Sequence, residues 1–425
     1  MGLMLEAGVR VSNMFVDRKQ SGGISHFLVA EPRVNATLNL LDSRNNPVFD
    51  LLALTGGFGI SNKMPTLMYL YPDYAYFDNA SLSKYGTETK DRLGLITTDV
   101  VKNTANPDLR PARSTKWEAG LSFRINRIKG FATFFHESHR HELGFTSQLI
   151  WQNYDKYTVP ATATDPVFDA ASGDVTYRVD GTEHTALRTK TTEMYTWSRA
   201  ANSTTTHKHG IEYGLDFGEI KPLHTSLNIS GAWFHIKRKN ENMPLNYINS
   251  SFDYVGVLPS GGGNLRDRFN STFRLITHIP AIKMVFTTSV QVVWYESTQV
   301  VYEDENGNSR YYLKSYEDKD YLVINPVGYY DKQGHYTVWS PADADDADKS
   351  RIMYRTQPYL YEKDVIKPWA LLSFRFTKEI GRVAELSVIA NNFTNTKKWH
   401  TNPHSLAKTQ LYPDMYFGAE LKLKL

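Results

Sequence analysis

The sequence contains no cysteine. This absence excludes a disulfide scaffold, a cysteine-ligated zinc site and a thiol nucleophile, and it suits a chain that crosses an oxidising compartment. The sequence also has no run of about twenty consecutive apolar residues, so a role within a membrane would require strands rather than helices. Residues 1–12 lack the basic and apolar regions of a signal peptide.

The sequence also lacks a large excess of positive or negative charge. Lys and Arg together number 48 and Asp and Glu 45, so there is no basic surface that would favour nucleic acid as a partner. No nucleophile elbow, glycine-rich phosphate loop or paired-carboxylate motif is present. We therefore predict that the protein is not an enzyme, and we expect no catalytic residues and no cofactor.

The sequence does contain segments in which apolar and polar side chains alternate. The clearest example runs from Ile282 to Trp294, where every second residue is apolar or Thr, as in a strand with one apolar face. Twelve segments of this kind predict strands at 4–15, 28–41, 48–60, 114–126, 128–146, 206–219, 223–238, 265–279, 282–300, 367–378, 384–394 and 413–425.

The connections between these segments alternate between short and long. Short turns are predicted at 42–47, 126–127, 219–222, 280–281 and 379–382, and long connections at 61–113, 147–205, 239–264, 301–366 and 395–412. Transmembrane barrels show this order, because tight periplasmic turns alternate with large extracellular loops. Asn306-Gly307 predicts a hairpin turn in one of these loops, with the ninth and tenth strands extending toward it.

The last residues, 417–425, alternate up to the carboxyl terminus. Phe417, Leu421 and Leu423 share one face, and Glu420 and Lys422 share the other. In a membrane barrel we expect the leucines to face lipid and the lysines to face the lumen.

Four local motifs resemble the barrel of TonB-dependent outer-membrane receptors. They are the stretch 106–111 (NPDLRP) followed by Glu118-Ala119-Gly120-Leu121, the stretch Glu31-Pro32-Arg33, the stretch 57–65 (GFGISNKMP), and Asn391-Asn392-Phe393. They occur in the family's order and span most of the chain. Ala112 stands where the family usually has Glu, and Leu425 stands where a terminal aromatic residue is common.

The resemblance implies an all-β fold: an antiparallel transmembrane β-barrel with long extracellular loops in the outer membrane. Family barrels have 22 strands and a plug domain, so residues 1–425 are expected to form the C-terminal half of such a barrel, without plug or signal peptide. The implied function is uptake of an iron chelate, vitamin or oligosaccharide. The implied partners are the TonB energising complex acting through the missing plug region, the small-molecule or glycan substrate, outer-membrane lipid and a surface lipoprotein.

An aromatic stretch in the first long connection is our main candidate for ligand binding. Aromatic faces with nearby hydrogen-bonding groups suit sugars or aromatic ligands, although the loop could equally pack its aromatic rings together as a compact lid. Two aromatic residues of the next long connection are added to the set. The candidates are Tyr69, Tyr71, Tyr74, Tyr76, Phe77, Trp151 and Tyr154.

Two stretches raise the possibility of a metal site. His139 and His141 share a strand face in 136–142 (HESHRHE), but His136 faces the other way, so a polar strand end is the better interpretation. The acidic stretch 343–348 follows Ser340-Pro341 and lacks the pattern of a calcium loop, which favours a helix N-terminus there. We predict no metal site.

Two other classes of protein remain open. A self-contained twelve-stranded barrel, acting as a passive pore or an enzyme, requires the first and last strands to pair. A soluble all-β binding protein requires the apolar strand faces to be buried against a second sheet.

Overall fold

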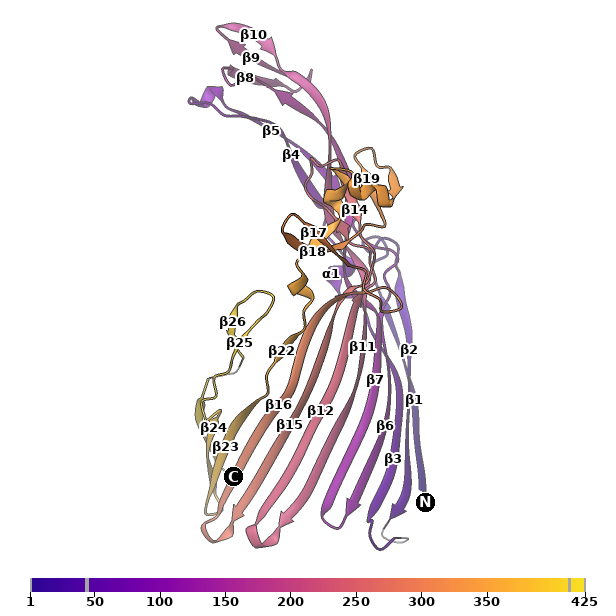
Figure 1. Cartoon of the computed structure of the whole chain (residues 1–425), viewed down its shortest axis with the longest axis vertical. Coiled ribbons are helices and arrows are strands. Elements are labelled where there is room, and N and C mark those ends of the chain that lie inside the picture. Colours follow the sequence, from indigo (N-terminus) through magenta and orange to yellow (C-terminus); the bar gives the residue numbers. More distant parts are fainter. Residues whose placement is uncertain (1, 43–45, 412–413, 424–425) are drawn as a thin grey trace.

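A computed structural model describes residues 2–42, 46–411 and 414–423 of the chain. Twelve long strands form one antiparallel sheet in which each strand pairs with the next long strand along the chain (Figure 1). A short thirteenth strand, β22 (Asp364–Ile366), pairs with β16. The long strands are β1 (Gly2–Phe15), β2 (His26–Asp42), β3 (Leu51–Lys63), β6 (Ala112–Ile125), β7 (Ile128–Thr158), β11 (Leu187–Ile220), β12 (Thr225–Asn240), β15 (Gly262–Ile279), β16 (Met284–Tyr302), β23 (Trp369–Ile380), β24 (Ala384–Asn391) and β27 (Tyr416–Leu423).

Each of the twelve predicted segments overlaps one of these strands, so the all-β prediction and the strand order are confirmed. The short turns lie at one end of the sheet, which we call the turn end, and the long connections lie at the other, the loop end (Figure 1). Positive φ angles at Asn126 (52°), His224 (45°), Lys283 (50°) and Gly381 (60°) make the tight reversals. The predicted turn at 42–47 lies partly outside the described residues, and residues 424–425 of the last predicted strand lie wholly outside them.

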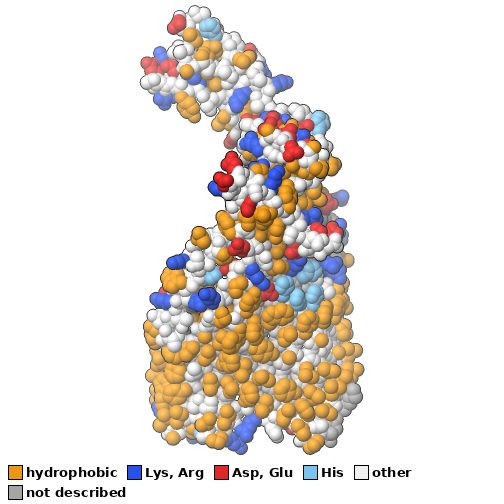
Figure 2. Space-filling view, in the orientation of Figure 1, with side chains coloured by type: hydrophobic (Ala, Val, Ile, Leu, Met, Phe, Trp, Pro, Cys, Tyr) orange, Lys and Arg blue, Asp and Glu red, His pale blue; other side chains and the backbone are white. Residues whose placement is uncertain are grey.

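The two faces of the sheet differ in chemistry. On β6, Trp117, Ala119, Leu121, Phe123 and Ile125 share one face, and the strand register aligns them with Phe58, Leu54 and Leu52 of β3. Lys116, Glu118, Ser122 and Arg124 alternate with them on the other face. We call these the apolar face and the polar face. Figure 2 shows the apolar face as a broad band of hydrophobic side chains across the sheet.

Two strands extend much further than predicted. β7 continues to Thr158 and β11 begins at Leu187, and their ladder pairs Lys129 with Asp216 at one end and Thr158 with Leu187 at the other. The prediction of a loop over 147–205 was therefore wrong for both flanks of that connection. The predicted turn at Asn306-Gly307 does form, but beyond it the chain enters a separate sheet, so the predicted extension of the tenth strand was wrong.

Smaller elements make up the loop region, which we define as all structure beyond the loop end. They form separate sheets of two to four strands and short helical turns. These are α1 (Leu67–Leu70), β4 (Ala75–Lys84), η1 (Thr89–Asp91), β5 (Leu93–Val101), β8 (Thr164–Asp169), β9 (Asp174–Val179), β10 (Thr182–Thr185), β13 (Leu245–Asn246), β14 (Tyr254–Val257), β17 (Tyr312–Tyr316), β18 (Lys319–Ile324), β19 (Gly328–Asp331), β20 (Tyr336–Val338), η4 (Pro341–Asp345), η5 (Lys349–Ile352), β21 (Tyr354–Thr356), η6 (Pro358–Tyr361), β25 (Trp399–Thr401) and β26 (Lys408–Gln410). At the turn end, η2 (Lys221–Leu223) and η3 (Pro280–Ile282) lie in the tight turns.

Ser340 starts η4 as predicted. Its backbone N–H donates to the Asp343 carboxylate at 2.8 Å, and the Lys349 ammonium lies 2.7 Å from the same carboxylate. Asp343 is therefore buried and paired, rather than solvated as a simple helix N-terminus would leave it.

Buried apolar clusters lie in or beside the loop region. One contains Phe27, Leu70, Leu109 and Ala200, and another contains Leu82, Tyr157, Val175 and Ala186. No described residues form a covering layer of this kind on the apolar face of β1, where Leu3, Leu5, Val9 and Val11 are 64–70% exposed. Among the described residues, no helix has the length and hydropathy needed to cross a membrane.

The sheet has two open edges within the described residues. β1 pairs only with β2, and β27 pairs only with β24 (Figure 1). The strand pairing that a self-contained twelve-stranded barrel requires is therefore not present in the part of the chain that the structure describes.

Candidate ligand passage

The polar face carries two cavities at different heights. Both are lined by side chains from adjacent strands, because residues two apart on a strand point to the same side and the register sets neighbouring strands level. We call them the turn-end cavity and the loop-end cleft.

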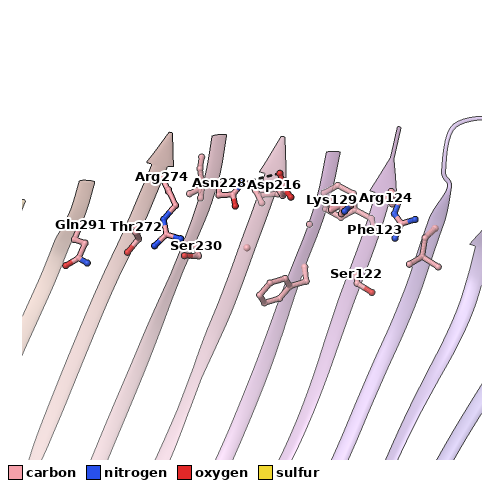
Figure 3. Close-up of a pocket in the computed structure, with 16 residues that line it drawn as sticks. Ser122, Phe123, Arg124, Lys129, Asp216, Asn228, Ser230, Thr272, Arg274 and Gln291 are labelled. Carbon is pink, nitrogen blue, oxygen red and sulfur yellow. Dashed lines mark hydrogen bonds between the residues drawn. The ribbon is translucent and has the colours of Figure 1, made fainter. Parts of the chain in front are cut away.

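The turn-end cavity has a volume of about 670 Å³. Polar side chains from six adjacent strands surround it (Figure 3). Those labelled in the figure that lie on the polar face are Ser122, Arg124, Lys129, Asp216, Asn228, Ser230, Thr272, Arg274 and Gln291.

Positive charge predominates in this cavity. Arg124 and Lys129 lie directly opposite each other on β6 and β7, and Arg274 approaches from β15. Asp216 is held in place, because its Oδ1 accepts hydrogen bonds from Asn228 Nδ2 at 3.1 Å and from the Gly218 N–H at 2.8 Å. Three cations against one carboxylate favour an anionic group at this position.

The loop-end cleft has a volume of about 620 Å³ and lies where α1 and the sheet meet. A network of charges centred on Glu137 lines it. Glu137 lies 3.2 Å from His139 Nε2, 3.6 Å from Lys208 Nζ and 4.0 Å from Lys116 Nζ, and Lys116 also pairs with Glu118 at 3.0 Å. The full lining is Ser61, Asn62, Lys63, Thr66, Met68, Tyr69, Ala112, Arg113, Ser114, Lys116, Glu137, His139, Glu142, Leu143 and Arg238. Arg113 borders the cleft at the start of β6, although the strand register assigns its side chain to the apolar face.

The predicted aromatic stretch divides into three parts. Tyr69 borders the cleft and packs on Phe145 with ring centroids 5.3 Å apart, and the Tyr71 hydroxyl accepts a hydrogen bond from the Asp17 N–H. Both tyrosines pack against the buried cluster around Leu70, as the compact-lid interpretation expects.

The rest of the stretch lies on β4 or just before it. Tyr74 and Tyr76 are 52% and 64% exposed and point into solvent, where rings are available to a ligand. Phe77 is half-buried and packs on Tyr195, with centroids 5.5 Å apart. The structure therefore does not bring Tyr69, Tyr71, Tyr74, Tyr76 and Phe77 together as one surface.

Trp151 and Tyr154 lie on the extension of β7. The Trp151 Nε1–H donates to the Asp331 carbonyl at 2.9 Å, and its ring meets the Tyr330 ring edge-on at 5.7 Å. Trp151 thereby fastens the 303–368 connection to β7. Tyr154 is buried, with 7% of its surface exposed. Trp151 and Tyr154 therefore contribute mainly to packing.

A buried hydrogen-bonding network that the sequence did not suggest surrounds Glu193. The Tyr195 hydroxyl donates to the Glu193 carboxylate at 2.6 Å, and Tyr154 and Ser250 also hydrogen-bond to it. Burial, followed by the interaction with Glu193, raises the pKa of Tyr154 and of Tyr195 to about 12. The available signal was the alternation of residues 191–197 (TTEMYTW), which resembles a strand within the predicted loop.

The histidines of 136–142 do not converge. His139 pairs with Glu137 on the polar face, His136 lies on the apolar face, and His141 has a positive φ of 58° that interrupts the alternation. In the described ranges, no group of three or more His, Asp or Glu side chains is arranged to hold a metal ion.

Comparisons of the sequence with protein-family models and with curated proteins find no match. The features that bear on function are therefore the two faces of the sheet, the two cavities and the loop region.

Proposed function

We propose that this chain forms part of the wall, together with the long loops, of an outer-membrane β-barrel. The barrel takes up a nutrient in a TonB-dependent manner. In this proposal the apolar face contacts lipid, the polar face lines the passage, and the loop region faces the exterior and captures the ligand. The substrate class is an iron chelate, a vitamin or an oligosaccharide. Energy comes from TonB acting through a plug domain, and a surface lipoprotein is a further candidate partner.

The observation that carries the proposal is the exposed apolar face. On β6 it runs from Trp117 to Ile125, which is nine residues, and a tilted strand needs about 9–11 residues to cross the hydrocarbon of a bilayer. Burying a leucine or valine side chain is worth about 1.5–3 kcal/mol, so leaving a whole sheet face in water would be very costly. A lipid environment removes that cost.

The order of the connections supports the same orientation. Tight turns gather at one end, and the loop region with its own buried clusters gathers at the other (Figure 1). Outer-membrane barrels place short turns in the periplasm and long loops outside. The loop-end cleft then opens toward the exterior and the turn-end cavity lies near the periplasm, so a ligand would meet the Glu137 network first and the cationic cavity second.

The test uses the absence of cysteine. Single cysteines replace the adjacent residues Leu121 and Ser122, which lie on opposite faces of β6. In intact outer membranes, a water-soluble maleimide is expected to label Ser122→Cys and spare Leu121→Cys, because only the polar face meets water. Equal labelling of both variants, or recovery of the protein in the soluble fraction, would refute the membrane assignment.

Energised uptake has a separate test. Cells that express the protein are given a ferric siderophore, cobalamin or a maltooligosaccharide, with and without a protonophore. Because TonB acts through a plug domain, cells that express residues 1–425 by themselves are expected to show no accumulation that collapses with the proton gradient, and such accumulation would contradict the proposal. Uptake that is insensitive to the protonophore would favour a passive pore instead.

A further inference from the structure

A cationic patch lies on the apolar face, just beyond the hydrophobic band at the loop end. We call it the rim patch and define it as Arg113 of β6, Arg140 and His136 of β7, and His207 of β11. The register places Arg113 on the face of Trp117, and Arg140 on the face of His136. Figure 2 shows histidine and basic side chains gathered along the upper border of the apolar band.

The two arginines are direct cross-strand neighbours. Arg113 pairs with Arg140 in the β6–β7 register, and both residues are exposed. Within the described part of the chain, no carboxylate lies within ion-pair distance of either guanidinium. Like charges directly opposite each other on a sheet are destabilising, unless an anion lies between them.

Other charges around the patch are already compensated. His235 Nδ1 lies 2.8 Å from Asp267, and Lys237 forms an ion pair with Glu303. The His207 ring interacts electrostatically with Arg140, His136 and Lys237, and with the single carboxylate Glu241. The uncompensated positive charge therefore lies at the β6–β7 side of the patch.

The height of the patch matches the headgroup region of a bilayer. Trp117, His136, His209 and His235 are aligned in one row across four strands, with Trp117 and His136 rings 5.9 Å apart. Aromatic side chains of this kind mark the interface of membrane barrels. Arg113 lies four residues beyond Trp117, which is about 13 Å along the strand and about 10 Å in height at a tilt near 40°. That height lies at the level of the polar headgroups.

We infer that the rim patch binds the phosphate group of an anionic lipid in the outer leaflet. Guanidinium groups bind phosphate in a bidentate manner, and two of them on adjacent strands can hold the oxygens of one phosphate between them. His136 and His207 extend the donor surface toward β11. This inference rests on the proposed membrane location, and it adds a specific lipid site to it.

The experiment measures lipid binding to the full chain in detergent by native mass spectrometry. The probes are phosphatidylglycerol, a bisphosphorylated lipid A and zwitterionic phosphatidylcholine, with inorganic phosphate as competitor. The double variant Arg113→Gln/Arg140→Gln is expected to lose roughly thirtyfold in affinity for the two anionic lipids and to bind phosphatidylcholine unchanged. Arg113→Lys/Arg140→Lys should restore part of the lost affinity.

The control is Lys314→Gln/Lys319→Gln. It removes the same charge from the hairpin of β17 and β18 in the loop region, away from the rim patch and from both cavities, and it should leave binding of anionic lipid unchanged. Equal loss in both double variants would overturn the inference, since net charge alone would explain it. Complete displacement by millimolar inorganic phosphate would also overturn it, because the site would then prefer the free anion.

Failure of the proposed function gives a different result. If the Leu121→Cys and Ser122→Cys labelling pattern holds while anionic lipids show no preference for the native protein, only the lipid site is refuted. If the labelling pattern itself fails, the membrane assignment is refuted first.

Discussion

The sheet and the loop region treat their apolar side chains in opposite ways. On the apolar face, Leu54 and Leu121 remain 44% and 42% exposed, whereas Met194 and Ile352 in the loop region are 0% exposed. The loop region buries its apolar side chains in packed clusters, whereas the sheet leaves apolar side chains exposed along one face, as the proposed contact with lipid requires. If the proposed function is right, one chain is adapted to two solvents, lipid and water, and the boundary lies at the loop end of the sheet.

The largest expected effect concerns the buried side chains of the loop region. Met194→Ala removes a fully buried side chain and leaves a cavity, which should lower the free energy of unfolding of the loop region by about 2–5 kcal/mol. Denaturant titration of the purified protein, followed by tryptophan fluorescence, measures it. Leu187→Ala, at a position that is 68% exposed, is the control and should change stability by less than about 0.5 kcal/mol. Similar losses at both positions would show that the loop region is not packed as described.

The next effect tests the lipid-facing half. Leu121 lies midway between Trp117 and Ile125, so Leu121→Lys would place a charge near the middle of the bilayer and cost about 2–4 kcal/mol. Ser122→Lys, on the polar face, should cost much less. Equilibrium unfolding from lipid vesicles gives both values. A tolerated lysine at 121 would contradict the assignment of this face to lipid.

A smaller effect concerns pH and only the loop region. Burial would raise the pKa of Glu193, but hydrogen bonds from Tyr195, Ser250 and Tyr154 outweigh it and lower that pKa below its ordinary value. The ionised carboxylate therefore stabilises the fold at pH values above the unfolded pKa of about 4.3, and this stabilisation is lost as the pH falls through the lower folded pKa. Near-ultraviolet circular dichroism between pH 7 and 3 should show a step that Glu193→Gln lacks, while the sheet signal stays constant.

The network around Glu193 also loses stability at alkaline pH. The pKa of Tyr154 and of Tyr195 is raised to about 12, so their neutral forms stabilise the fold fully below pH 10, and this contribution is lost as the pH rises from 10 through 12. The difference in tyrosinate absorbance between the native protein and Tyr154→Phe should have its midpoint near pH 12. A midpoint near 10 would mean that Tyr154 is not buried against Glu193.

The smallest effect lies on the polar face. Arg375 Nη2 is 2.8 Å from Glu420, but the two side chains are 44% and 52% exposed, so solvent weakens the attraction. Arg375→Gln should cost at most about 1 kcal/mol in the vesicle unfolding assay. A larger cost would mean that this part of the polar face is shielded from water.

Strand order and turn positions could be predicted from the sequence because both are encoded locally. The alternation in 282–294 and the turn residues Asn126 and Gly381 act over a few neighbours, and the structure confirms them. The two chemically different faces follow from the same period of two.

The loop region could not be predicted in this way. β7 and β11 extend because they pair with each other across a connection of 28 residues, 159–186, and local alternation does not reveal a partner at that distance. The aromatic candidates were chosen by composition, which does not reveal that Tyr71 packs inward while Tyr76 faces solvent. Glu193 was missed because its partners Tyr154 and Ser250 come from distant segments.

The β7–β11 ladder also has a mechanical consequence. At about 3.4 Å per residue, the 31 residues of β7 span about 100 Å, so one hydrogen-bonded ribbon, with register shifts near Thr204, reaches from the turn end to the most distant loops. Such a ribbon behaves as a lever: a tilt of about one degree at its base moves the tip by nearly 2 Å. Small rearrangements beside the turn-end cavity would thus be amplified at the outer end of the molecule.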